Sequence, residues 1–132
     1  MTGDPAPAAH AAMLTVSDRW WTAVWRDGDV AAMADIFTDP MTRHTSSGSE
    51  TLRIADYQRR IADTQRAFCC ATTTVDDRSV DGDRVWTRAT SRGINKETGE
   101  PSLVTWLIVQ RFEADRIAEH WVATLAGIDW TA

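Results

Sequence analysis

The stretch that decides the fold is residues 84–125, RVWTRATSRGINKETGEPSLVTWLIVQRFEADRIAEHWVATL, in which apolar and polar side chains alternate with a period of two. Alternation of this kind predicts strands, here over residues 84–95, 102–113 and 117–125. Short connections separate these segments, one with Gly99 and one formed by Ala114-Asp115. Consecutive strands joined by short turns predict an antiparallel meander.

Working outward, residues 68–76 predict a fourth strand, which the turn Asp81-Gly82-Asp83 joins to the meander. Everything before Phe68 has mainly helical spacing. We expect helices over 13–27, 30–37 and from Thr51 to about 67, with a short strand at 41–46 and a loop at 46–49. Helices that are separate in sequence from an antiparallel meander indicate the α+β class.

The chain has 132 residues, which fits one domain with a core of its own. Residues 1–12 are rich in Ala and Pro, and we expect them to form a flexible N-terminal segment. Residues 13–132 are expected to form a single domain.

The net charge of −5 argues against nucleic acid or an anionic membrane as a partner, because both require a basic face. No apolar run approaches the ~20 residues of a membrane span. The N-terminus lacks the pattern of a secretory signal. These observations predict a cytoplasmic protein.

Two features of the composition stand out. Cys69 and Cys70 are adjacent, and neighbours on a strand point to opposite faces, so we expect two free thiols rather than a bridge. Seven tryptophans in so short a chain indicate large flat apolar surfaces, partly in the core and partly around a planar ligand.

Several local phrases of the sequence stand out: Gly28-Asp29, Asp35-Ile36-Phe37 before a strand with His44, residues 81–85, 111–113 and, above all, Arg116-Ile117-Ala118-Glu119-His120-Trp121. These phrases resemble the SnoaL-like polyketide cyclases of the NTF2-like superfamily, relatives of ketosteroid isomerases and limonene epoxide hydrolases. The resemblance spans about residues 13–125. It implies an NTF2-like cone, in which a curved, mainly antiparallel sheet wraps around three N-terminal helices and encloses one apolar pocket.

The positions that carry catalysis in these relatives hold other residues here. The oxyanion tyrosine, base and acid of ketosteroid isomerases align with Trp21, Thr45 and Ile108. The cyclase aspartate aligns near Val122. Arg88 matches the arginine of limonene epoxide hydrolases, but Thr90 replaces the partner aspartate. The known mechanisms of these relatives are therefore not expected.

Three residues are candidates for catalysis. His120 and His44 titrate near neutrality and suit general acid or base roles, although strand parity leaves open whether His44 or Thr45 faces the pocket. Arg88 suits the polarisation of a substrate oxygen, or alternatively pairs with Glu119 or another surface acid. The alternatives for His120 are a histidine held by hydrogen bonds within the sheet and one on the outer, dimer-forming face.

We expect the substrate to contact aromatic and neighbouring side chains on the strand faces and helices: Trp21, Trp25, Tyr57, Trp86, Thr90, Trp106, Ile108, Gln110 and Val122. The scattered histidines and carboxylates have no metal-ligand spacing, and no phosphate-binding or dinucleotide motif is present. The sequence therefore predicts chemistry without a cofactor or metal.

Two functions follow. The resemblance implies an enzyme of secondary metabolism that promotes cyclisation, rearrangement or a proton shift of an apolar, polyketide-like substrate. The alternative is a non-catalytic binding or scaffold protein. In either case we expect a homodimer formed through the outer sheet face, with Leu107, Val109, Trp121 and Ala123, because an exposed apolar face needs covering.

Overall fold

The computed structural model describes residues 6–131. The chain begins with α1 (Ala6–Arg19), which continues as the π-helix η1 (Trp20–Arg26). The 3-10 turn η2 (Val30–Ala32) and the short α2 (Met33–Ile36) lead into β1 (Phe37–Thr45) and β2 (Gly48–Leu52). The remaining elements are α3 (Ile54–Arg66), β3 (Phe68–Asp81), β4 (Arg84–Asn95), β5 (Pro101–Glu113) and β6 (Arg116–Ala126).

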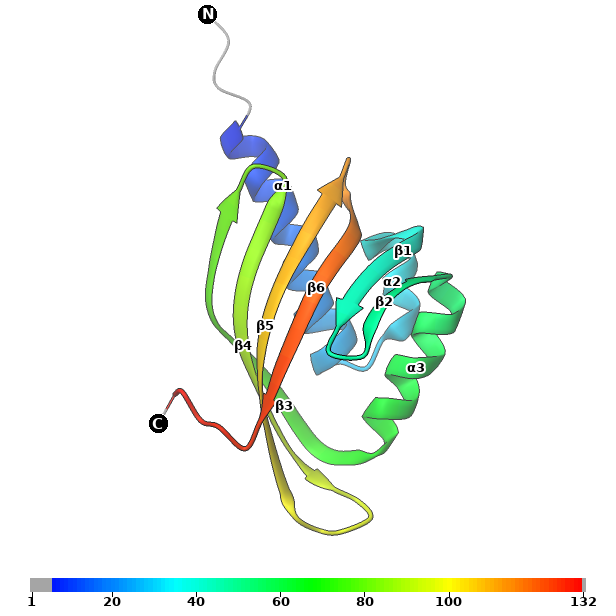
Figure 1. The fold of residues 1–132 in the computed structure, drawn as a ribbon, viewed down its shortest axis with the longest axis vertical. Helices are drawn as coiled ribbons and strands as arrows, with labels where there is room; N and C mark the ends of the chain where they lie inside the picture. Colours follow the sequence, from blue (N-terminus) through cyan, green and yellow to red (C-terminus); the bar gives the residue numbers. More distant parts are fainter. Residues whose placement is uncertain (1–5, 132) are drawn as a thin grey trace, which may run out of the picture.

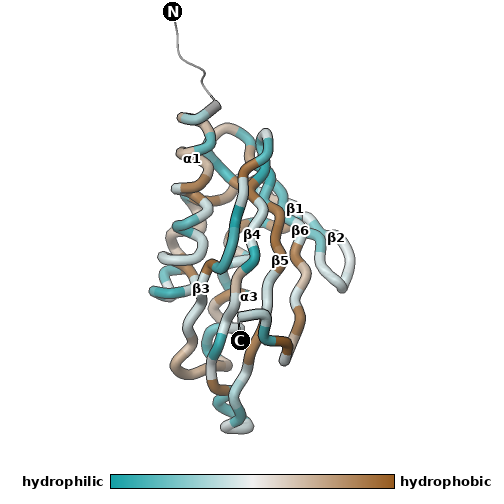
Figure 2. The backbone as a smooth tube through the Cα atoms, turned by 90° about the vertical axis from the view of Figure 1, so that its left-hand side faces the viewer, coloured by the Kyte–Doolittle hydropathy of each residue, from teal (hydrophilic) through white to brown (hydrophobic). Residues whose placement is uncertain are grey.

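The strands form one six-stranded sheet in the order β2-β1-β6-β5-β4-β3 (Figure 1). Strands β3 to β6 form the predicted antiparallel meander, and β1 pairs in parallel with β6. The helices lie on one face of this curved sheet, and the turned view places α1 on one side of the strands (Figure 2). The α+β class and the cone-like arrangement are confirmed.

The core lies between the helices and the sheet, and it is mainly aromatic on the side of β1. Trp20 and Phe37 are almost completely buried, with ring centroids 5.1 Å apart. Tyr57 from α3 completes this cluster, 5.9 Å from Trp20 and 5.6 Å from Phe37. The apolar face of α3 carries Ile54, Tyr57 and Ile61, the spacing of an amphipathic helix.

Several predicted boundaries differ from those in the structure. The first helix begins at Ala6, not Met13, so only residues 1–5 of the expected flexible segment lie outside the described residues. The loop predicted at 46–49 is a tight hairpin, and Thr51 lies in β2 rather than capping α3. Polar β2 is an edge strand with little apolar alternation, which is why its pattern resembled a loop.

The expectation that the Cys69 and Cys70 side chains point to opposite faces was wrong, because their sulfur atoms lie against each other on one side of the strand. The alternation argument fails locally. Cys70 has a positive φ of 61°, and the register with β4 slips between Cys69 and Thr72. Such a bulge allows neighbouring side chains to share one side of a strand.

We predict that Phe37→Ala lowers the free energy of unfolding by about 3–5 kcal/mol, because it leaves a cavity beside Trp20 and Tyr57. Urea unfolding followed by circular dichroism measures the loss. Phe68→Ala is the matched control, since Phe68 is only partly buried and should lose less. Equal losses for the two variants would contradict this view of the core.

Candidate functional site

Strand alternation divides the sheet into a helix-covered face and an open outer face. On β5, the side chains of Trp106, Ile108 and Gln110 belong to the helix-covered face, and Ile108 and Gln110 are fully or almost fully buried. On β4, the helix-covered positions are Val85, Thr87 and Ala89, all buried. The intervening Trp86 is 48% exposed and belongs to the outer face.

A cavity of about 470 Å³ opens where the end of η1 and the end of α3 approach β3, β4 and β5. We call it the tryptophan pocket, because Trp25 and Trp106 form its wall, with ring centroids 5.3 Å apart. Phe68 and Val104 add apolar surface. Its volume lies in the range of small-molecule sites, and its aromatic wall suits a flat apolar ligand.

Several polar side chains that line the tryptophan pocket already form hydrogen bonds or ion pairs within the protein. The indole N–H of Trp106 donates to Ser91 Oγ at 2.8 Å, and Ser91 Oγ lies 2.7 Å from Thr73 Oγ1. The charged residues among the described lining are in ion pairs: Arg26 with Asp27, and Arg92 with Asp129. No imidazole or phenol belongs to the described lining, so the wall presents little acid or base chemistry.

His120 lies in the core rather than on a cavity wall. It is completely buried beside Phe37, and its Nε2 lies 3.3 Å from the Tyr57 hydroxyl. Burial, and then the charges of Arg43 and His44, lower the pKa of His120 to about 3. A neutral imidazole with so low a pKa is a weak base at neutral pH. This position agrees with the alternative interpretation given above, in which His120 is a histidine held within the sheet and not a catalytic group.

Other predicted substrate contacts lie in the packed interior and do not line the tryptophan pocket. Burial raises the pKa of Tyr57 to about 12, so its hydroxyl remains protonated. Gln110 accepts a hydrogen bond from Ser17 Oγ at 2.7 Å. Ile108 and Trp21 are almost fully buried, and Val122 packs against the core. Of the expected contacts, Trp25 and Trp106 line the tryptophan pocket.

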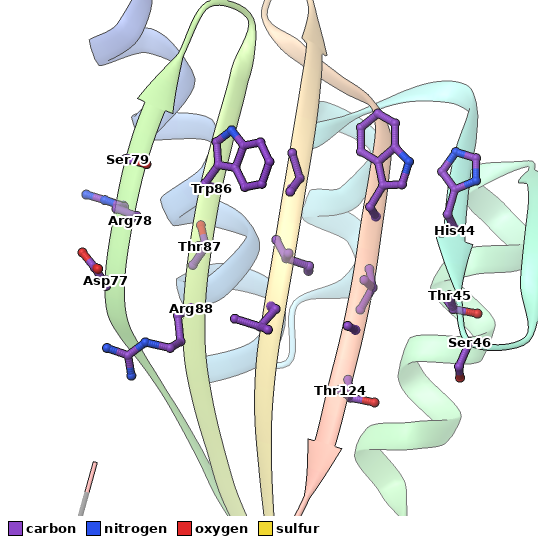
Figure 3. Close-up of a pocket in the computed structure, with 16 residues that line it drawn as sticks. His44, Thr45, Ser46, Asp77, Arg78, Ser79, Trp86, Thr87, Arg88 and Thr124 are labelled. Carbon is purple, nitrogen blue, oxygen red and sulfur yellow. The ribbon is translucent and has the colours of Figure 1, made fainter. Parts of the chain in front are cut away.

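Three predicted residues of β4, namely Trp86, Arg88 and Thr90, lie on the outer face, so their expected place inside the cone was wrong. Trp86 and Arg88 line an open groove of about 780 Å³ on that face (Figure 3), and Thr90 donates to Asp76. Arg88 lies 3.8 Å from the same carboxylate, the surface pairing given above as its alternative. His44, whose direction strand parity had left open, lines the same outer groove. Alternation had grouped the β4 residues correctly, but it could not say which face the helices cover.

Phe68 and Val104 are pocket residues that the sequence argument missed. Val104 lies two positions before Trp106, so the alternation that placed Trp106 inside could have found it. Phe68 stands directly after α3, at a junction whose direction no local pattern specifies.

Within residues 6–131, no cluster of three potential metal ligands occurs. In the same range, no helix is long and apolar enough to cross a membrane.

Comparison with known proteins defines the family. The model of the SnoaL-like domain family matches residues 18–120, so this chain belongs to that family. No curated protein matches the sequence.

Solved structures show the same fold at low sequence identity. A polyketide cyclase candidate from Acidithiobacillus ferrooxidans is 21% identical, with a TM-score of 0.78 over 86% of this chain and 87% of its own. The polyketide cyclase candidate IdmH from Streptomyces antibioticus is 23% identical, with a TM-score of 0.72 over 86% and 90%. A Catenulispora acidiphila protein with a ketosteroid isomerase-like fold, in complex with trimethylamine, is 18% identical, with a TM-score of 0.70 over 81% and 82%.

We predict that burial of neutral His120 makes stability depend on pH. Its folded pKa of about 3 lies below the ordinary 6.5, so the unfolded chain binds a proton first as pH falls. The contribution of His120 to the free energy of unfolding is therefore fully present above pH 6.5. Below that pH it decreases by at most about 1.4 kcal/mol per pH unit. Urea unfolding at about pH 7, 6 and 5 measures this slope, above the range in which most carboxylates titrate.

The control for this prediction is His120→Gln, which removes the titrating group and should flatten the slope over this pH range. Tyr57→Phe retains the imidazole but removes its 3.3 Å neighbour, so it should retain a slope. If His120→Gln has the same pH dependence as the original protein, buried neutral His120 is not its source.

Proposed function

We propose that this protein binds an apolar small molecule of the polyketide type in the tryptophan pocket and promotes its ring closure by holding it in a folded conformation. The observation that carries this proposal is the pocket itself, a cavity of about 470 Å³ with Trp25 and Trp106 on its wall. A flexible substrate held against this rigid aromatic wall loses the conformational freedom that otherwise opposes cyclisation.

Proton transfer by the three predicted catalytic residues is not part of this mechanism. His120 is sealed in the core, and His44 and Arg88 lie on the opposite face of the sheet. The charged groups at the pocket rim pair with one another. Confinement and the exclusion of water are therefore the contributions that the lining is suited to make, without a cofactor.

A non-catalytic carrier is the second candidate function. It is favoured by the same lining, because a wall with little acid or base chemistry is also suited to binding a molecule and releasing it unchanged. Family membership does not separate the two, since one fold serves many functions.

We also propose that the protein is a homodimer whose copies meet through the outer sheet face. Trp86 and Leu107 are large apolar side chains with 48% and 41% exposure on that face, and Val109, Trp121 and Ala123 lie beside them. Opposite charges on the same face, such as Arg88 and Asp77, are suited to an interface in which each copy presents the same surface.

We predict that 1,8-dihydroxyanthraquinone, used as a planar aromatic probe, binds to the protein and quenches its tryptophan fluorescence. Trp25→Ala and Trp106→Ala should each weaken binding by about tenfold, because each removes one of the two indoles that form the aromatic wall of the pocket. Trp86→Ala is the matched control, since it removes an indole from the outer face and should leave the affinity unchanged. Equal effects of all three variants would contradict binding in the tryptophan pocket.

Turnover distinguishes the two candidate functions. A linear tetraketide N-acetylcysteamine thioester is incubated with the protein, and cyclic products are followed by liquid chromatography and mass spectrometry. A cyclase forms them faster than buffer does, with a loss in Trp25→Ala and none in Arg88→Gln. A carrier binds the thioester and leaves its rate of cyclisation unchanged.

We predict that Leu107→Glu converts the dimer into a monomer, because it places a charge in the apolar centre of the outer face. Light scattering at micromolar concentration measures the mass. Ile94→Glu is the control, since Ile94 is equally exposed at 41% but lies near the distal β4–β5 hairpin. A monomer mass for the original protein would refute the dimer.

A further inference from the structure

Three side chains on neighbouring strands form a hydrogen-bonded chain at one edge of the outer face. Ser49 on β2 lies directly opposite His44 on β1, and its Oγ is 2.6 Å from His44 Nδ1. His44 Nε2 lies 2.6 Å from Oε2 of Glu119 on β6. A hydroxyl, an imidazole and a carboxylate are thus connected in series, the first two across one hairpin and the third 75 positions away from His44.

The proton positions in this chain follow from Glu119. The hydrogen bonds from His44, and then from Arg111, hold the pKa of Glu119 below its usual range, so its carboxylate only accepts. The facing Nε2 must therefore carry the proton. In the neutral imidazole, Nδ1 then has a free lone pair, and the Ser49 hydroxyl donates to it.

Arg111 and Trp121 hold the two acceptor groups in place. Arg111 Nε donates to Glu119 Oε1 at 2.9 Å, which fixes the carboxylate with its other oxygen toward His44. The His44 ring stacks on Trp121, with centroids 5.2 Å apart and planes 17° apart. The imidazole is thus positioned on one face by the indole and at Nε2 by Glu119.

We propose that Ser49, His44 and Glu119 form an esterase site, separate from the tryptophan pocket, that hydrolyses small activated esters. A nucleophile within hydrogen-bond reach of a base, which a third group orients, is the arrangement that nucleophilic catalysis requires. The ring nitrogens are used in the reverse of the order known from serine proteases, but the roles are the same. Ser49 is a catalytic residue, His44 is its base, and Glu119 is a positioning residue.

Ser49 is accessible to small molecules in the single chain. Its side chain is exposed, and the His44 side chain retains 28% of its exposure. Strand β2 is the edge of the sheet, and an edge strand presents alternate backbone N–H groups that have no partner strand. Such N–H groups are the donors that stabilise the oxygen of a tetrahedral intermediate.

The reaction balances without a co-reactant other than water. Ser49 Oγ attacks the ester carbon and its proton moves to His44 Nδ1. The bond to the leaving alcohol then breaks, and that alcohol takes the proton from Nδ1. Water attacks the acyl-serine, passes a proton through Nδ1 back to Ser49 Oγ, and releases the acid.

The test is covalent labelling with an alkyl fluorophosphonate, in which Ser49 Oγ forms a bond to phosphorus and fluoride leaves. Trypsin releases residues 44–53 as one peptide, and its fragmentation locates the adduct among Ser46, Ser47 and Ser49. We expect the adduct on Ser49, its loss in Ser49→Ala, and its retention in the neighbouring control Ser47→Ala. No adduct, or an adduct retained in Ser49→Ala, would overturn the proposal.

Hydrolysis of p-nitrophenyl acetate gives a second measurement. His44→Gln should lower the rate above background by about 100-fold, the contribution of a general base. Glu119→Gln should lower kcat with little change in KM, because an amide that donates to Nε2 moves the imidazole proton to Nδ1. A rate that His44→Gln and Glu119→Gln both leave unchanged would contradict the proposal and show that these hydrogen bonds only link the strands.

Leu107→Glu separates this site from dimerisation and from the proposed pocket function. Leu107 lies on the outer face away from the edge strand, so its replacement should leave the labelling of Ser49 intact. Trp25→Ala should also leave it intact, since Trp25 lines the tryptophan pocket on the other face. Labelling that disappears in either variant would contradict an independent site.

Discussion

The packing of Trp20 against Phe37, Tyr57 and His120 is the contact on which the rest of the structure depends. It joins the π-helix, β1, α3 and β6 at one point, and all four side chains are buried. By filling the interior between helices and sheet, this cluster keeps His120 neutral and away from ligands. The cavity on the helix-covered face therefore lies farther along, at the tryptophan pocket between η1, α3 and the meander.

The alternation of the strands then gives the two faces different chemistry. On the helix-covered face, Trp25 and Trp106 offer an apolar wall with few titratable groups. On the outer face, His44, Glu119 and Arg111 form a hydrogen-bonded network beside exposed apolar side chains. The aromatic pocket and the hydrogen-bonded titratable residues therefore lie on opposite faces of the sheet, rather than together inside one cone.

Much of the fold could be predicted from the sequence, because strand alternation and helical spacing are local patterns. The meander and the grouping of Trp86 with Arg88 on one face were predicted correctly. The edge strand β2 was missed, since its polar residues bury little and leave no apolar period. The adjacent cysteines were misjudged because a bulge with positive φ at Cys70 interrupts the alternation.

The sequence by itself determined the class, the order of most elements and the family, because periodicity and short motifs are properties of neighbouring residues. Only the tertiary structure decided which face of each strand the helices cover, and with it that Arg88 is outside and His120 sealed inside. It alone also brought Ser49 to His44 and His44 to Glu119, 75 positions away. The physical reason is that burial and long-range contacts depend on how elements pack, and no local pattern carries that information.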